Sequence, residues 1–223
     1  MTAAAPATSL RHPLPQALLV LTFTTGIVDA VSFLGLGRVF TANMTGNVVL
    51  LGFGIAGSAG LPIAAPFASL GAYVVGAVAG GRIARAVSAE LLSTALAVEV
   101  MLLGAAALIA AVTTVKPGGS VTYVLIVLLA FVMGLRSACI RRLGASDIST
   151  VVLTMLLVDL ASGSPFAGGS GFGTVRRVSA VVVMGAGALA GALLLRVDLA
   201  LPLVVAAGLA LVTREAYRTA VAA

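Results

Sequence analysis

The fold class is decided by the stretch from Gln16 to Leu36, which reads QALLVLTFTTGIVDAVSFLGL. A membrane-spanning helix needs about 20 mostly apolar residues, and this stretch is that long. Asp29 is its single charged residue. Similar apolar runs fill the rest of the chain, with short polar breaks between them. The sequence therefore predicts an all-α fold, a polytopic transmembrane helical bundle.

The composition of the whole chain supports this prediction. Of the 223 residues, 61% are hydrophobic and 9% are charged, and the mean hydropathy is +1.20. A soluble domain carries roughly 45–50% apolar and roughly 25% charged residues. A fold of this size has too little interior to hide the excess of apolar surface from water. A water-soluble enzyme, a nucleic-acid binder and a disordered chain are therefore all disfavoured.

The charged and reactive residues exclude further classes of protein. The net charge of +6 arises from 13 Lys and Arg against 7 Asp and Glu. The basic residues stand singly or in pairs between apolar runs, which is typical of membrane loops and unlike a nucleic-acid surface. Cys139 and His12 are the only residues of their types, so a cysteine or histidine metal cluster and a histidine base lack their groups. We expect no metal site, no cofactor and no enzymatic activity.

Eight apolar segments can be placed along the chain. Three of them, 41–59, 148–161 and 199–212, are short or interrupted, so six or seven full spans also fit the sequence. With eight spans the basic residues divide equally between the two sides, so the orientation is not predicted. The polar end from 214 to 223 is expected to be free. The expected segments are 16–36, 41–59, 62–82, 90–115, 121–140, 148–161, 178–195 and 199–212.

Two parts of the chain resemble each other, which predicts an internal duplication. A Gly-Ala-x-Ala-Gly run occurs at 76–80 and again at 187–191, and an arginine, Arg85 or Arg196, follows each run at the same spacing. Weaker matches occur at nearly the same separation along the chain: Thr41 corresponds to Thr150, and Gly26 corresponds to Gly134. The expected division is an N-terminal tail (1–15), a first half (16–115), a loop (116–120), a second half (121–215) and a C-terminal tail (216–223). Four spans per half, which we expect, would give both halves the same orientation, whereas three would invert them.

Glycines four residues apart occur in both copies. Small residues at this spacing form a flat strip on which two helix backbones can approach closely. We expect a role in helix packing for Gly76, Gly80, Gly187 and Gly191.

Four charged residues lie inside or near the ends of the apolar segments. A charge at the bilayer centre costs at least ~2.5–3.5 kcal/mol, so each needs a physical reason. Asp29 shares a helical face with Thr22, Thr25 and Ser32, and Glu99 stands alone in its segment. Both are predicted to bind a cation or carry protons. In the alternative, Asp29 forms a structural pair with a charge partner, Arg136. Arg136 lies four or five residues inside the end of its segment, deep enough to matter but shallow enough for its side chain to reach the interface. Asp159, a second possible charge partner, lies near a segment end.

The densest polar cluster in the apolar part of the chain is Thr41-Ala42-Asn43-Met44-Thr45-Gly46-Asn47. On a helix its threonines and its asparagines, each four residues apart, would form two adjacent polar rows. Amides and hydroxyls beside a glycine can bind a polar solute or an ion. The alternative is a polar helix cap at the membrane surface. The predicted solute- or ion-binding residues are Asp29, Thr41, Asn43, Thr45, Gly46, Asn47 and Glu99.

The run Gly26-Ile27-Val28-Asp29-Ala30, followed by Gly35-x-Gly37-Arg38-Val39-Phe40 and the 41–47 cluster, resembles the YoaK-like family. Members of this family are bacterial integral membrane proteins classed as a domain of unknown function. The resemblance covers about 16–215 and implies a location and an architecture, but it supplies no reaction. The second half departs from the pattern, because Met155 follows Thr154 where the first half has Gly46 after Thr45.

Transport is the leading functional prediction, with a polar path between the two halves and an intramembrane carboxylate as the proton or cation site. The alternative is a membrane scaffold or sensor that transports nothing. The expected location is the inner (plasma) membrane of a bacterium, crossed several times. The expected partners are the lipid bilayer and an unknown small solute or ion, without nucleic acid, and a homo-oligomer is left open.

Overall fold

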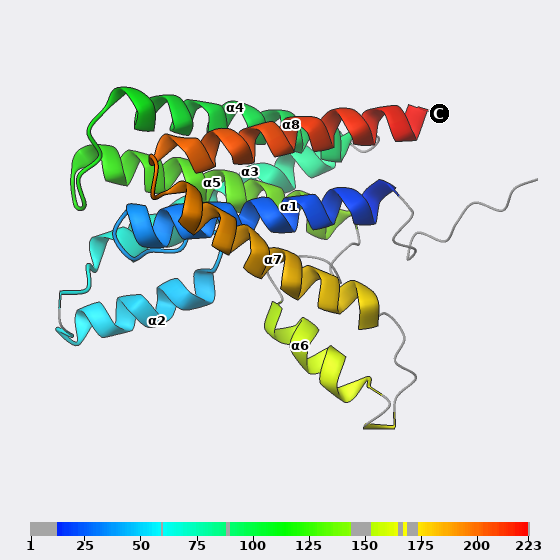
Figure 1. Cartoon of the computed structure of the whole chain (residues 1–223), viewed down its shortest axis with the longest axis horizontal. Coiled ribbons are helices and arrows are strands. Elements are labelled where there is room, and N and C mark those ends of the chain that lie inside the picture. The colour runs from blue at the N-terminus through cyan, green and yellow to red at the C-terminus, as the bar shows by residue number, and fades with distance from the viewer. Residues whose placement is uncertain are drawn as a thin grey trace, which may run out of the picture.

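The structure is a computed structural model that describes residues 13–58, 60–87, 90–143, 153–164, 167–168 and 174–222. Residues 153–155, 159 and 222 are described by their backbone alone. Every regular element in these ranges is a helix, as predicted (Figure 1). The elements are α1 (Pro13–Ala30), continued by the π-helix η1 (Val31–Gly35), α2 (Met44–Ile55), α3 (Ala64–Ala86), α4 (Leu91–Val112), α5 (Ser120–Arg142), α6 (Leu153–Ser162), α7 (Thr174–Leu194) and α8 (Ala200–Ala222).

Six of these helices are long and apolar enough to cross a membrane: α1 with η1, α3, α4, α5, α7 and α8. Helices α2 and α6 have 12 and 10 residues, fewer than the about 20 that a span needs. The described residues therefore fit the six-span alternative.

The predicted end of the last segment at Val212 is wrong, because α8 continues to Ala222. Contacts with other helices explain why this end is not free. Tyr217 packs on a cluster that contains Leu18 of α1 and Leu92 of α4. Nearby, the Arg214 side chain donates a hydrogen bond to the Ser93 carbonyl oxygen at 3.2 Å.

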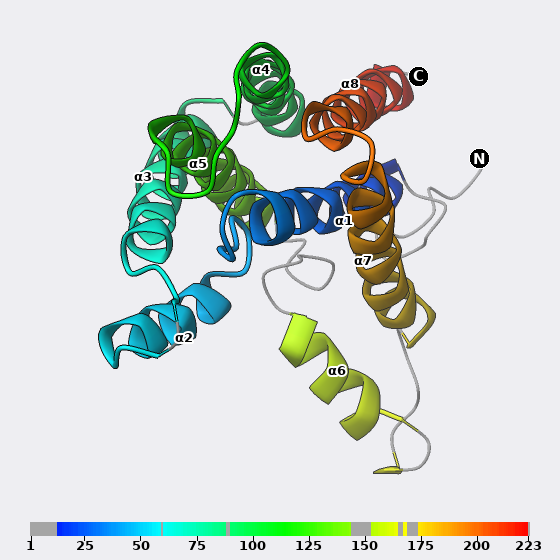
Figure 2. The same cartoon turned by 60° about the vertical axis from the view of Figure 1, so that its left-hand side comes forward.

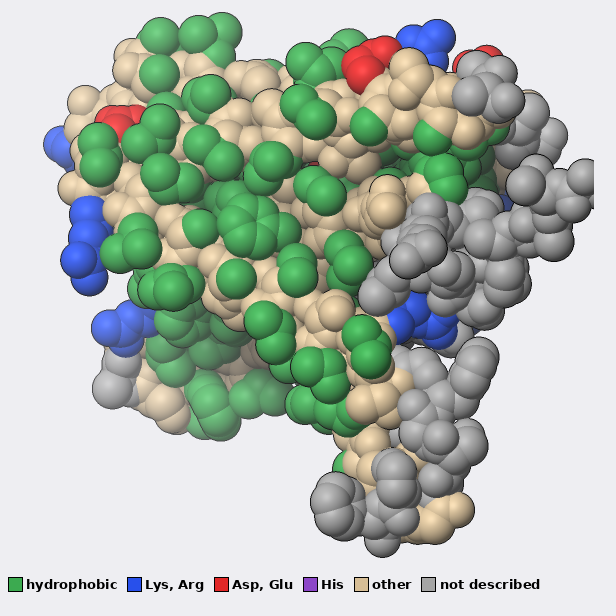
Figure 3. Space-filling view, turned by 45° about the vertical axis from the view of Figure 1, so that its right-hand side comes forward, with side chains coloured by type: hydrophobic (Ala, Val, Ile, Leu, Met, Phe, Trp, Pro, Cys, Tyr) green, Lys and Arg blue, Asp and Glu red, His purple; other side chains and the backbone are tan. Residues whose placement is uncertain are grey.

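Helix α1 lies in the middle of the bundle (Figure 2). Helices α3 and α5 lie on one side of it, α7 on the other, α4 and α8 above, and α2 and α6 below. Of the most apolar part of each span, 72% is buried for α1 but only 17% for α7. The polar residues of α1 therefore face protein and not lipid. Hydrophobic side chains cover the middle of the outer surface in Figure 3, and the charged side chains lie toward its two ends, as a bilayer requires.

The directions of the helices follow from the two main core clusters. At one end, Leu18, Leu92, Ile140 and Tyr217 come together. At the other end the core is made by Val31, Ala110, Leu125 and Leu203. Residue numbers therefore rise in the same direction along α1 and α4, and in the opposite direction along α5 and α8. In the described residues α1 and α5, the first long helices of the two predicted halves, therefore run in opposite directions, which is the arrangement expected for three spans per half and not for four.

Glycines bring two pairs of parallel helices into backbone contact. A methyl group added at Gly76 of α3 would overlap the Phe131 carbonyl oxygen of α5, and one at Gly187 of α7 would overlap the Phe23 carbonyl oxygen of α1. Gly80 and Gly191 meet the same partner helices one turn further on. The small residue at each site is what allows the two backbones to approach so closely.

The contacts are also reciprocal. The carbonyl oxygens of Tyr73 and Met184 leave no room for a side chain at Gly134 of α5 and Gly26 of α1, respectively. The α3–α5 and α1–α7 interfaces are thus built from glycines at matching positions.

Candidate functional site

The polar residues of α1 are buried in the bundle. Thr22, Thr25, Asp29 and Ser32, which the helical spacing places on one face, are between 0 and 6% exposed. The threonine hydroxyls donate to carbonyl oxygens of the preceding turn, Thr22 to Leu18 and Thr25 to Leu21, each at 2.8 Å. These internal bonds satisfy the hydroxyl protons and leave the oxygens free to accept from other helices.

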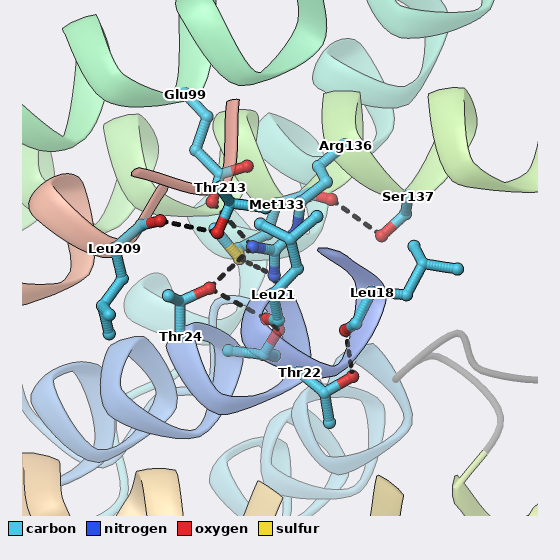
Figure 4. Close-up of polar contacts among 11 residues, drawn as sticks. Leu18, Leu21, Thr22, Thr24, Glu99, Met133, Arg136, Ser137, Leu209 and Thr213 are labelled. Atoms are coloured by element: carbon cyan, nitrogen blue, oxygen red, sulfur yellow. Dashed lines mark hydrogen bonds and ion pairs between the residues drawn. The ribbon is translucent and has the colours of Figure 1, made fainter. Parts of the chain in front are cut away.

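Arg136 of α5 donates hydrogen bonds to threonine hydroxyl oxygens of α1. Its Nη1 lies 2.6 Å from Glu99 Oε1 of α4 and donates to Thr24 Oγ1 at 3.1 Å, while Nη2 donates to Thr25 Oγ1 (Figure 4). Arg136 is 3% exposed and Glu99 is fully buried. Of the two readings of its depth, the buried one therefore describes Arg136, which is a charge partner inside the bundle. Glu99 compensates its charge inside the bundle, so the arginine has no need to extend toward water.

The second carboxylate oxygen of Glu99 is buried without a hydrogen-bond partner in the described part of the chain. Buried polar atoms without a partner are rare in folded proteins. The Arg136–Glu99 pair thus joins α1, α4 and α5 and still keeps one free acceptor.

Asp29 is held by backbone donors. Its Oδ1 accepts hydrogen bonds from the backbone nitrogens of Thr41 at 3.1 Å and Ala42 at 2.9 Å. Among the described residues, the proposed structural partner of Asp29, Arg136, pairs with Glu99 instead. Asp29 therefore fixes the segment after η1 against α1 and brings the 41–47 cluster next to the carboxylate.

The chain between η1 and α2 is irregular. Gly37 and Arg38 have φ of 105° and 60°, in the left-handed region that ends a helix. The side chain of Asn43 caps α2 by accepting a hydrogen bond from the Gly46 nitrogen at 3.2 Å, so the predicted rows of Asn43 with Asn47 and Thr41 with Thr45 do not form on one helix. For Asn43, the alternative of a polar helix cap is therefore the one that the structure has.

Asn47 holds this irregular segment in place. Its amide accepts from the Phe40 nitrogen at 2.9 Å and donates to the Phe40 oxygen at 2.6 Å and to Ser69 Oγ at 3.1 Å. The side chain is fully buried. Because these bonds occupy its amide, Asn47 is a structural clamp between the segment and α3.

A cavity of about 650 Å³ lies among α1, α2, α3 and α7. Of the predicted binding residues, Asp29, Asn43, Thr45 and Gly46 line it. Thr41, Asn47, Glu99 and Arg136 are not in its wall. The predicted residues thus separate into a cavity wall, to which Thr41 is bound through Asp29, and two supporting networks, one around Arg136 and one around Asn47.

Sequence reasoning missed part of this wall and its supports. Phe33, Phe40, Tyr73, Met44 and Met184 also line the cavity, but they are ordinary apolar residues in the sequence. Ser69 and Thr24 are hydrogen-bond partners that lie outside the polar stripe and cluster. No sequence signal marks them. The side chain of Asp159 lies outside the described residues, as does Thr150.

A second cavity of about 860 Å³ lies toward the end of the bundle that carries Arg38, and the start of α5 also lines it. Both cavities have Phe33 and Leu50 in their walls. The two spaces are therefore neighbours, and these two apolar side chains stand where they meet.

Comparisons with known proteins agree with the membrane fold. A family model described as "Protein of unknown function (DUF1275)" matches residues 17–214. The chain is 33% identical over 147 residues to a protein of Bacillus subtilis (strain 168), the UPF0700 transmembrane protein YoaK, and the alignment covers 64% of each chain. No solved structure matches the chain. The predicted resemblance to the YoaK-like family is confirmed, and the protein is an integral membrane protein.

Proposed function

Since the chain belongs to the DUF1275 family, whose function is unknown, we propose a function from its geometry: the protein transports a small solute or ion. The observation that carries this proposal is a carboxylate, Asp29, in the wall of a cavity inside a membrane-spanning bundle. An ionisable group at this depth is costly and is characteristic of solute and proton pathways. Asp29 is the proposed proton or cation site, and Thr45 is a proposed solute contact.

The neighbouring cavities support a path. We assign the larger cavity as a vestibule at the Arg38 end and the smaller one as the binding site. Phe33 and Leu50, which line both, would form the barrier between them. Phe33 belongs to η1, and single-turn π-helices in longer helices are frequent at functional sites. Movement of η1 would open or close the connection.

Two inverted repeats are the proposed architecture. The reciprocal glycine contacts and the opposite directions of α1 and α5 support it. Inverted repeats that enclose a site near the middle of the bilayer are typical of secondary transporters, which alternate access by moving one repeat against the other. The proposed axis lies in the membrane plane.

The six-span arrangement also allows an orientation to be proposed. The end of the bundle where α1 begins and α8 ends carries a large excess of arginines. The opposite end carries Arg38, Lys116 and Arg196. By the positive-inside rule, we place the first end in the cytoplasm of a bacterium. The arginines at that end are Arg82, Arg85, Arg141, Arg142, Arg176, Arg177, Arg214 and Arg218.

Cysteine labelling tests the orientation. In a Cys139→Ala background, single cysteines are placed at Thr114, in the α4–α5 loop, and at Thr219, near the end of α8; both positions are exposed. A membrane-impermeant maleimide should label Thr114→Cys in intact cells, and Thr219→Cys only after permeabilisation. The reverse pattern would contradict the proposed orientation.

Transport itself is tested with purified protein in liposomes by measuring the uptake of radiolabelled amines, amino acids, sugars and nucleosides, applied in turn, with pyranine inside the liposomes to report any coupled movement of protons. We expect at least one solute to give a protein-dependent flux that the Asp29→Asn variant lowers about tenfold or more, because the variant removes the charge at the proposed site. The control is Glu215→Gln, at an exposed carboxylate on α8. If no solute moves, or if Asp29→Asn transports as well as the control, the protein is not the proposed transporter.

A further inference from the structure

We propose that the cavity beside Asp29 binds a small organic cation, either a protonated amine or a quaternary ammonium ion. This inference rests on the proposed function in naming the solute class of the same site. It also stands as a statement about binding, whether or not the protein moves the ligand. Three properties of the cavity wall carry it: its charge, its aromatic and sulfur groups, and its size.

The charge of the wall is negative. Asp29 is the one formally charged residue among the described residues that line the cavity. The nearby Arg136 does not line it and is matched by Glu99 at 2.6 Å. Two backbone nitrogens bind Oδ1 of Asp29, and no described residue donates a hydrogen bond to Oδ2. A cation would therefore find a buried carboxylate with an oxygen available, whereas an anion would be repelled.

Aromatic and sulfur groups make up much of the remaining wall. Phe33 and Phe40 stack with their ring centroids 4.8 Å apart, and Tyr73, Met44 and Met184 line the same space. The faces of aromatic rings attract cations, and such rings together with a carboxylate recognise ammonium groups. Methionine sulfur is polarisable and adapts to the shape of a ligand.

A metal ion suits this wall poorly. Calcium takes 6–8 oxygen ligands and magnesium requires an octahedron of oxygens. Here the oxygen of Thr25 already accepts a hydrogen bond from Arg136, and the side chain of Asn43 caps α2. The volume of about 650 Å³ is within the roughly 300–1,000 Å³ of small-molecule sites, and it is far larger than a bare ion fills.

Arg38 does not oppose a cation at this site. It lines the larger neighbouring cavity and is exposed, so that water and salt screen its charge. Tyr73 is the other titratable side chain in the wall of the smaller cavity. The negative potential there is set by Asp29.

The test measures binding to the purified full-length protein in detergent by equilibrium dialysis. The probes are choline, tetramethylammonium, tetraethylammonium and butylammonium. The neutral control is 3,3-dimethylbutan-1-ol, which has the shape of choline without its charge. We expect at least one cation to bind, and choline, if it binds, to bind at least about tenfold more tightly than its neutral analogue. Asp29→Asn, whose amide oxygen can still accept from Thr41 and Ala42, should weaken binding about tenfold or more.

Matched variants distinguish the loss of a specific contact with the cation from a general loss of folding. Tyr73→Leu should weaken cation binding by about two- to fivefold and Tyr73→Phe should not, because a cation–π contact needs the ring and not the hydroxyl. Glu215→Gln should bind as the wild type does. The inference is overturned if no cation in the panel binds, if the neutral analogue binds equally well, or if a folded Asp29→Asn variant, with unchanged circular dichroism, binds equally well. Cation binding without flux in liposomes would support this inference and count against transport.

Discussion

Replacing Arg136 by methionine is expected to lower the free energy of unfolding by about 3–5 kcal/mol, which is the range for breaking a buried ion pair from one side. The substitution leaves the Glu99 carboxylate fully buried with neither of its oxygens paired. It also removes the donor to Thr24 and Thr25 of α1. The loss is measured as a shift of the denaturation midpoint in detergent, followed by far-ultraviolet circular dichroism.

The partner variant separates the pair from the packing of its side chains. Glu99→Leu should destabilise the protein by a similar amount, because it leaves the Arg136 guanidinium buried without its counter-charge. The double variant, Arg136→Met with Glu99→Leu, should be more stable than either single variant, since it removes both buried charges together. Strictly additive losses would show that the ion pair does not couple α4 to α5.

A surface pair in the same protein is the control for Arg136. Arg218 lies 3.6 Å from Glu215, and both side chains are about half exposed. Arg218→Gln should change the stability by no more than about 1 kcal/mol, because water and side-chain entropy offset most of the attraction at the surface. A loss as large as that of Arg136→Met would mean that burial does not set the strength of these pairs.

The fold could be predicted from the sequence because the bilayer imposes it. Apolar length and the breaks between runs identified each helix in the described part of the chain, and the three short or interrupted segments included α2 and α6. The error at α8 has a physical cause. The polar residues after Val212 suggested a free end, but Tyr217 and Arg214 find partners on α1 and α4. Such contacts depend on which helices are neighbours, which hydropathy does not report.

Part of the candidate site could also be predicted from the constraints that the bilayer imposes. The free-energy cost of a charged side chain inside the membrane singles out Asp29, Glu99 and Arg136. All three are buried in the bundle, which agrees with that reasoning. Which residue pairs with which was not predictable, because the partners of Arg136 lie on two other helices, α1 and α4. The aromatic wall of the cavity carries no signal at all, since Phe33 and Tyr73 look like any other apolar residues.

Placing alanine at Gly187 is expected to destabilise the protein by about 1–3 kcal/mol, although alanine is the better helix former. The new methyl group would overlap the Phe23 carbonyl oxygen, so α7 would have to move away from α1. That movement would disturb the helix that carries Asp29 and the threonines bound to Arg136. The measurement is the denaturation midpoint in detergent.

Gly185, two residues earlier on the same helix, is the matched control, because an added methyl group there meets nothing within 4 Å. Gly185→Ala should leave the stability unchanged or raise it by up to about 1 kcal/mol through helix propensity. Equal effects at Gly185 and Gly187 would show that the α1–α7 contact is not as close as the structure has it. Gly76→Ala, which meets the Phe131 carbonyl oxygen of α5, extends the test to the other half. If the two halves are inverted copies, its cost should match that of Gly187→Ala, because each methyl group then forces apart the same kind of parallel helix pair.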